Sequence, residues 1–245
     1  MSVDRAFTKE DLDHCLKELA KEFRKRNGRR MPAEMILIGG ASVLINYGFR
    51  EMTYNMDAII HSSGAMKDAI ITVGERLELP KGWLNTDFMK TSSYSPKLVR
   101  YSRYYKTFSN ILQVRTITAE YLVAMKLMAG RLYKNDLSDI VGILMEQEAR
   151  GDALTLARIQ MAVTELYDNY ERIPESSRDF IEDVFAKDDL QEFYRQCRSM
   201  ELENKEILVE FQDDYPGVLN GDNLGDILKA ARERKEDAAD IKGEA

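Results

Sequence analysis

The chain has 245 residues, 44% of them hydrophobic and 31% charged, which suits a soluble globular protein of one large domain or two small ones. The formal net charge of -7 argues against a general nucleic-acid-binding protein, so any nucleic-acid contact must come from a local patch. The two distant cysteines, the two histidines and the lack of any long apolar run exclude a disulfide scaffold, a His-rich metal site and a membrane span, and favour a cytoplasmic protein.

The first expected element is an amphipathic helix that starts after Thr8 and ends at Gly28. Thr8 and Asp11 have the spacing of a capping box, and leucines follow at helical intervals. Residues 35–38 form a short apolar run typical of a buried strand, and a Gly-Gly turn and a short helix over 41–47 follow.

Further along, residues 53–61 and 111–117 are predicted strands, and residues 98–108 alternate as a strand does. A turn is expected at Ser109-Asn110, a helix over 65–77, and a loop over 79–95. From Thr118 onward the apolar residues recur at helical spacing. Helices are expected near 119–133, 137–149, 153–171, 176–186, 189–211 and 224–235, with a loop over 213–223.

The pattern therefore predicts the α+β class, with a boundary near Ile117. Residues 1–117 would form a small mixed-sheet α/β domain with an N-terminal helix. Residues 118–245 would form an all-helical domain that ends in a charged, frayed tail. Because the first domain is small, its core is expected to continue into the helical half.

Gly39, Gly40 and Ser42 lie between a predicted buried strand and a helix start. Glycines let the backbone approach a ligand closely, and free N–H groups at a helix start attract anions. By itself this pattern is most often an ordinary turn. It is neither a P-loop nor a dinucleotide fingerprint, because the further glycine and lysine positions of those motifs are absent.

Arg50, Thr53, Asn55 and Asp57 follow within one short connection. On a strand, residues 53, 55 and 57 share one face, which would present a hydroxyl, an amide and a carboxylate side by side. Buried polar groups need partners, so this face suggests a ligand site. An exposed strand edge would explain the same pattern.

The stretch resembles the nucleotidyltransferase superfamily that includes the DNA polymerase β-like enzymes. Members carry a Gly-Gly or Gly-Ser turn before a helix, and an Asp-x-Asp pair on the next strand. The chain is most similar to a bacterial group of uncharacterised nucleotidyltransferase-like proteins, related to the nucleotidyltransferases of abortive-infection and toxin–antitoxin systems. The segments GWLNTDF (82–88), TAEYLVAMKLMAGR (118–131) and KNDLSDIVGIL (134–144) extend the resemblance, which covers roughly 34–146.

The resemblance implies a triphosphate contact for Gly39, Gly40 and Ser42, with Arg50, Thr53 and Lys126 nearby. It implies catalytic and metal-binding roles for the pair Asn55 and Asp57, with Mg²⁺ as cofactor. Asn55 departs from the family pattern because it replaces the first acid. A third acid would fall near Gln113, where none is present, and Asp87 is a possible substitute.

Lys126 lies on an otherwise apolar helix. It could extend to the surface, pair with Asp136 or Asp139 at the start of the next predicted helix, or reach a phosphate of the nucleotide. The segment VRYSRYYKTF mixes cations with tyrosines. That mixture suits either contact with a nucleic acid or aromatic packing across a strand pair.

Two hypotheses follow. The chain is a nucleotidyltransferase that binds a nucleoside triphosphate with Mg²⁺ and transfers a nucleotidyl group to a hydroxyl of RNA, a protein or a small molecule. Alternatively, it is a catalytically impaired member of that fold that senses a nucleotide or binds a partner protein, such as one encoded in the same operon. The retained Asp57 favours the first hypothesis, and Asn55 favours the second.

Overall fold

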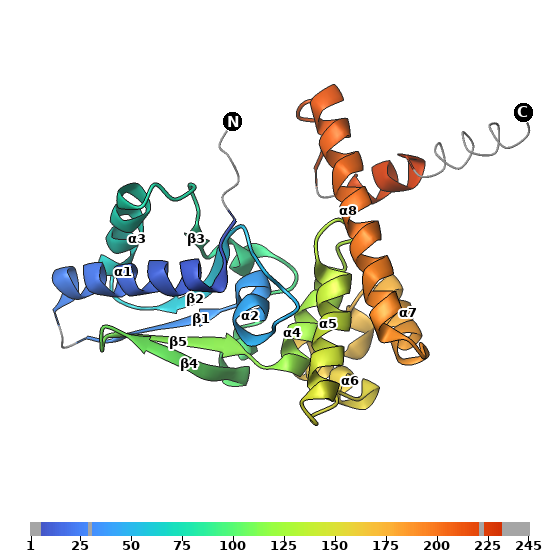
Figure 1. Cartoon of the computed structure of the whole chain (residues 1–245), viewed down its shortest axis with the longest axis horizontal. Helices are drawn as coiled ribbons and strands as arrows, with labels where there is room; N and C mark the ends of the chain where they lie inside the picture. Colours follow the sequence, from blue (N-terminus) through green and yellow to red (C-terminus); the bar gives the residue numbers. More distant parts are fainter. Residues whose placement is uncertain (1–5, 29–30, 221–222, 232–245) are drawn as a thin grey trace, which may run out of the picture.

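The computed structural model describes residues 6–28, 31–220 and 223–231. Figure 1 shows a sheet with its covering helices in one half of the molecule, and a group of helices in the other half. The predicted α+β class is confirmed. The C-terminal group of helices, including the long α8, also agrees with the sequence pattern.

The sheet has five strands in the order β3-β2-β1-β5-β4. Their bounds are Ala33–Leu37 (β1), Met56–His61 (β2), Leu84–Asn85 (β3), Ser102–Phe108 (β4) and Leu112–Ile117 (β5). β1 runs antiparallel to β2 and parallel to β5, while β4 runs antiparallel to β5, and the short β3 runs parallel to β2. The sheet is therefore mixed, as the sequence predicted.

The helices alternate with strands only in the first half of the chain. Their bounds are Lys9–Asn27 (α1), Gly39–Asn46 (α2), Ala65–Arg76 (α3), Ala119–Ala129 (α4), Asp136–Ala149 (α5), Leu156–Tyr167 (α6), Glu175–Phe185 (α7) and Leu190–Asp214 (α8). Three 3-10 helices, Asp87–Lys90 (η1), Pro96–Tyr101 (η2) and Tyr170–Arg172 (η3), lie in the connections. The Thr8–Asp11 capping box and the end of α1 at Gly28 are confirmed.

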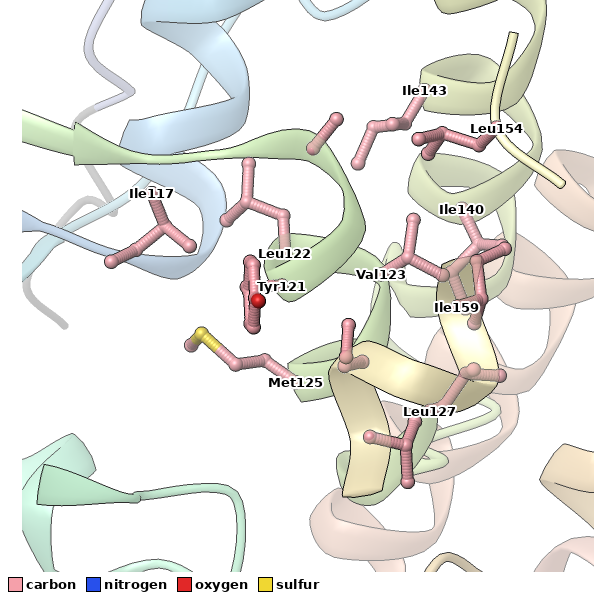
Figure 2. Close-up of a cluster of buried hydrophobic side chains, with 14 of the residues drawn as sticks. Ile117, Tyr121, Leu122, Val123, Met125, Leu127, Ile140, Ile143, Leu154 and Ile159 are labelled. Atoms are coloured by element: carbon pink, nitrogen blue, oxygen red, sulfur yellow. The ribbon is translucent and has the colours of Figure 1, made fainter. Parts of the chain in front are cut away.

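Two buried clusters hold the fold together. One lies between the sheet and helices α1 and α3, and contains Met35, Leu37 and Val114 among others. The other joins the opposite side of the sheet to α4, α5 and α6, and Figure 2 shows part of it, from Ile117 to Ile159. This second cluster contains Ile36 of β1 and crosses the predicted boundary near Ile117. The division into domains 1–117 and 118–245 thus remains a prediction.

Several predicted elements have different bounds or a different form. The helix expected over 119–133 ends at Ala129, and that over 153–171 is α6 followed by η3. The strand expected over 53–61 begins at Met56, and Thr53 instead forms an isolated bridge with Phe7. Residues 96–101 form η2, so only the second part of the predicted 98–108 strand is a strand. The expected loop over 79–95 contains β3 and η1.

At the C-terminal end, α8 continues to Asp214, two residues into the predicted loop, and residues 224–231 are helical. The remainder of the last predicted helix and the charged tail lie outside the described residues. Within the described ranges, no helix is both long and apolar enough to cross a membrane.

Candidate functional site

A cleft of about 450 Å³ lies between the sheet half and the helical half of the molecule. It opens where β1 ends and β2 begins, beside the N-terminus of α2 and the N-terminus of α5. Its lining consists of Gly39, Gly40, Arg50, Thr53, Asn55, Asp57, Asn85, Asp87, Phe88, Thr91, Ser92, Ser93, Met125, Lys126, Ala129, Arg131, Lys134, Asn135, Asp136 and Asp139. The cleft therefore brings together all but one of the predicted site residues.

The two glycines of the turn are required for different reasons. Gly39 has a φ of +53°, a left-handed backbone conformation that residues other than glycine rarely adopt. A Cβ at Gly40 would lie 2.8 Å from the Thr53 hydroxyl oxygen and 2.9 Å from a guanidinium nitrogen of Arg50. The glycines thus allow Thr53 and Arg50 to pack directly against the first turn of α2.

Asp57 is the carboxylate at the start of β2, and two asparagine amides lie beside it. Asn55 donates a side-chain hydrogen bond to Asp57 Oδ1 at 3.2 Å. Burial raises the pKa of Asp57, while a hydrogen bond from Asn85 and the nearby Lys134 and Arg131 cations act in the opposite direction. Asp57 is therefore a half-buried acid in a setting of amide donors and cations.

Lys126 is held in an ion pair, as one of the sequence alternatives stated. Its side chain is only 7% exposed, which excludes extension to the surface. The Lys126 ammonium lies 3.0 Å from Asp136 Oδ1 and 2.7 Å from Asp139 Oδ2. Because Lys126 also lines the cleft, contact with a phosphate remains a separate proposal.

Two arginines complete this network. Arg50 forms an ion pair with Asp139, and its Nε donates to the carbonyl of Met52 at 3.0 Å. Arg131 donates to both oxygens of Asp136, at 2.7 and 3.2 Å. Burial disfavours the Asp136 carboxylate, yet Lys126 and Arg131 outweigh it and lower the Asp136 pKa to about 2. Asp136 thus stays ionised, and the two aspartates together hold three cations at the cleft.

Lys134 is a further cation of the lining, and in the described part of the chain it forms no ion pair. Partial desolvation and the charge of Arg131 lower its pKa. Lys134 was not selected from the sequence, and Arg131 was noted beside Lys126 but was given no role. Their place before the helix expected over 137–149 gave no sign that they face the glycine turn.

Two positions considered from the sequence lie away from the cleft. Ser42 is fully buried and does not line the cleft, because its hydroxyl accepts a hydrogen bond from the backbone N–H of Ile117 at 3.1 Å. Gln113 pairs with Glu34, which also pairs with His61, so it lies several residues along the sheet from Asp57. Gln113 is therefore not the position at which a third acid would meet Asp57.

Asp87 lines the cleft from η1, where it pairs with Lys90 at 2.8 Å and is largely exposed. The adjacent wall is less charged, and the sequence gave no reason to select its residues, which are Phe88, Thr91, Ser92, Ser93, Met125 and Ala129. Phe88 packs edge-on against Tyr94. The cleft consequently has one strongly cationic side and one side of aromatic, thioether and hydroxyl groups.

The residues of VRYSRYYKTF lie outside this cleft, on η2 and the edge strand β4. Tyr101 of η2 stacks on Tyr121 of α4, with ring centroids 3.7 Å apart, which is aromatic packing against a helix and not across a strand pair. Lys106 pairs with Asp13 at 2.7 Å. Arg103 and Tyr104 are exposed on β4. This patch is therefore divided between packing and a free surface.

The donor set at Asp57 decides how many metal ions the cleft suits. A Mg²⁺ pair requires several anionic oxygens, whereas here Asp136 and Asp139 are bound to cations and Asn55 donates to Asp57. Within the described residues, no group of three His, Cys, Asp or Glu side chains is arranged to hold a metal. The set does not fit a metal pair. A single ion held by Asp57 and by oxygens of a ligand would be compatible with this set.

Comparison with known proteins identifies a family for the larger part of the chain. The model of a family described as a nucleotidyltransferase of unknown function (DUF6036) matches residues 14–172. No curated protein and no solved structure shows a significant match. The matched region includes the glycine turn, Asp57, the ion-pair network and α4 to α6, and ends before α7 and α8. The chain belongs to this family of nucleotidyltransferases of unknown function.

Proposed function

We propose that the cleft binds a nucleoside triphosphate with Mg²⁺ and that the protein transfers the nucleotidyl group to a hydroxyl. The observation that carries this proposal is the meeting of the glycine turn, Asp57 and four cationic side chains at one cleft, in a chain of the nucleotidyltransferase family. A triphosphate carries several negative charges, and cations beside a helix N-terminus match that charge.

The triphosphate would lie along the cationic side. The first backbone N–H groups of α2, at Gly39 and Gly40, would donate to phosphate oxygens, and Arg131 and Lys134 would neutralise charge. Lys126 and Arg50 are already paired with aspartates, so we assign them to the support of the wall and to a secondary phosphate contact. Asn55 donates to Asp57 and would orient its carboxylate, while Thr53 donates to the backbone carbonyl of Asn55.

Asp57 is the residue that would hold the metal, and the remaining ligands would be phosphate oxygens and water, as Mg²⁺ usually requires. The ion would supply positive charge at the α-phosphate and at the leaving oxygens. Asn55 would contribute an uncharged position beside Asp57. Because Asn55 is uncharged where the family pattern has an acid, the triphosphate would meet one negative charge fewer at this position.

In the transfer step, the acceptor hydroxyl oxygen bonds to the α-phosphorus and pyrophosphate leaves. Asp87 is the carboxylate of the cleft that we assign as the acceptor of the hydroxyl proton, because it lines the cleft and is largely exposed. The exposed Arg103 and Tyr104 offer a surface for an RNA acceptor outside the cleft. A protein acceptor would need no such patch.

A second candidate is a nucleotide-sensing or partner-binding protein that has lost the chemistry. The hydrogen bond from Asn55 to Asp57 favours it, because an amide donor stands where a second carboxylate would hold metal. In that case the nucleotide would bind without transfer. A partner encoded in the same operon would then read the bound state.

Thermal melting with ATP, CTP, GTP and UTP, each with and without Mg²⁺, tests binding directly, because a ligand of the native state raises Tm. We expect a Mg²⁺-dependent increase for at least one nucleotide, which Asp57→Ala abolishes. Asp68→Ala, on the exposed side of α3, is the matched control and should respond like the wild type. The absence of any increase would rule out the nucleotide site.

Incubation with labelled nucleotide and a mixture of RNA and protein acceptors then separates the two candidates. Transfer of label that depends on Mg²⁺ and on Asp57 supports the enzyme. A nucleotide-dependent rise in Tm without any transferred label, under every acceptor tested, supports the sensing protein instead.

A further inference from the structure

The N-terminus of α5 lacks the usual cap from its own chain segment. Asn135 occupies the N-cap position, yet its side chain makes no capping hydrogen bond. Its Oδ1 instead accepts a hydrogen bond from Arg198 of α8 at 2.7 Å. The first N–H groups of a helix have no partner within the helix, so another acceptor is needed here.

Glu201 of α8 supplies that acceptor. Its Oε1 accepts from the backbone N–H of Leu137 at 2.7 Å and of Ser138 at 3.3 Å. Its Oε2 accepts from the Ser138 hydroxyl at 2.5 Å. Glu201 is 2% exposed, so its carboxylate is committed to this helix end. A carboxylate here also matches the positive end of the helix dipole.

The same face of α8 holds the segment that precedes α5. Asn204, fully buried and one turn after Glu201, donates to the carbonyl of Leu132 at 2.6 Å. The Lys205 ammonium lies over the ring of Tyr54, 5.0 Å from the ring centroid. Tyr54 belongs to the loop that leads to Asn55. Helices α5 and α8 pack against each other, and α8 extends beyond α5 (Figure 1). Arg198, Glu201 and Asn204 of α8 thus form hydrogen bonds with the segment 132–138.

The cations that line the cleft are held by this segment and by the first turn of α5. Asp136 and Asp139, in the first turn of α5, hold Lys126, Arg131 and Arg50, and Lys134 lies between Leu132 and the cap. A shift of the α5 N-terminus would therefore move these cations together. Helix α8 lies beyond residues 14–172, the part of the chain that the family model covers.

We propose that Glu201, with Arg198 and Asn204, positions the cationic side of the cleft and thereby sets its affinity for the triphosphate group. This inference rests on the proposed function, because it assigns the phosphate end of the same site. It also implies that a ligand or partner that binds α8 and displaces Glu201 would change the affinity of the cleft for triphosphate without contacting the cleft itself.

Binding of inorganic triphosphate, followed by calorimetry without metal, is the test. This probe reports the cations without requiring a base, a metal or transfer. We expect Glu201→Ala to weaken binding about tenfold, because two buried N–H groups lose their acceptor. Glu201→Gln, which keeps one acceptor oxygen, should recover most of the affinity. Glu206→Gln, an exposed position on the same helix, is the charge-matched control and should bind like the wild type.

Hydrogen–deuterium exchange shows whether the effect arises where the structure places the contact. In Glu201→Ala, peptides that cover residues 131–138 should exchange faster, while peptides of β1 and β5 should not change. If Glu201→Ala does not fold, Arg198→Ala replaces it, because Arg198 is only partly buried and its loss should weaken triphosphate binding about threefold.

The outcomes separate the two claims. Faster exchange with unchanged triphosphate affinity would mean a purely structural cap, and would overturn the inference. If the wild type binds triphosphate but transfers no nucleotide, the proposed transferase activity is rejected, whereas the role of Glu201 in triphosphate binding is retained. A wild type that binds no triphosphate overturns both.

Discussion

Arg50 and Asp139 form an ion pair that joins the loop before β2 to the first turn of α5. The two residues are 89 positions apart in sequence, and both side chains are largely buried. Asp139 also accepts from Lys126, so one carboxylate ties a loop of the sheet half to α4 and α5 of the helical half. This contact links the two sides of the cleft that Arg50 and Asp139 line.

Replacement of Arg50 by Met should lower the free energy of unfolding by about 1–3 kcal/mol. A buried ion pair that loses one partner usually costs more, but Lys126 remains beside Asp139 and compensates part of its charge. Urea unfolding measures the change. Arg100→Met, at an exposed arginine without an ion pair in the described structure, should change it by less than about 0.5 kcal/mol. Equal effects for the two variants would contradict the role of this contact.

Gly40→Ala should destabilise the protein by about 1–3 kcal/mol and displace the Arg50 side chain, because the new methyl group would meet Thr53 and Arg50 at 2.8 and 2.9 Å. Thermal unfolding and a crystal structure of the variant measure these effects. Gly64→Ala is the control, since Gly64 has a helical φ of -57° and open space around its Cβ position. It should be neutral or slightly stabilising. A Gly40→Ala variant as stable as Gly64→Ala would contradict the close packing.

The pH dependence of stability should reveal Glu201. Burial raises the pKa of Glu201 to about 7, against an ordinary value of 4.5, although its hydrogen bonds from Ser138 and Leu137 favour the carboxylate. Between these values the folded protein binds a proton more tightly than the unfolded chain does. The stability that Glu201 contributes is therefore fully present below about pH 4.5 and falls as the pH rises through 7.

Glu201→Gln removes this titration. Between pH 5 and 8 the stability of the variant relative to the wild type should rise, by on the order of 1–3 kcal/mol. Chemical unfolding at several pH values measures it, and Glu206→Gln should run parallel to the wild type. A wild-type curve parallel to that of Glu201→Gln would show that Glu201 does not titrate in this window.

The local signals of the sequence predicted the fold well. The capping box at Thr8, the Gly28 stop and the Ser109-Asn110 turn rely on contacts between near neighbours, and all three are present. The strand over 53–61 failed at its start, because Thr53 pairs with Phe7 rather than continuing β2. Such a bridge depends on where the N-terminal segment runs, which no local pattern encodes.

For the site, too, the sequence indicated residues that are close together in the chain and not those brought together by packing. The glycine turn and Asp57 were found because they lie close together in sequence and resemble a known motif. Lys134 and Glu201 were missed, and Arg131 was given no role, because the positions of these residues depend on how α5 packs against α4 and α8. Ser42 was selected for its place in the motif, yet its hydroxyl serves the backbone of Ile117. Residue type and spacing alone could not distinguish these roles.

The central claim is that this cleft supports nucleotidyl transfer with one carboxylate, Asp57, at the metal position. The most direct measurement compares nucleotide labelled at the α-phosphate with nucleotide labelled at the γ-phosphate, in the presence of Mg²⁺ and acceptors. The account predicts that the α-label becomes attached to an acceptor, that the γ-label is released in pyrophosphate, and that Asp57→Asn prevents both. Attachment of the γ-label, or α-label transfer that persists in Asp57→Asn, would contradict it.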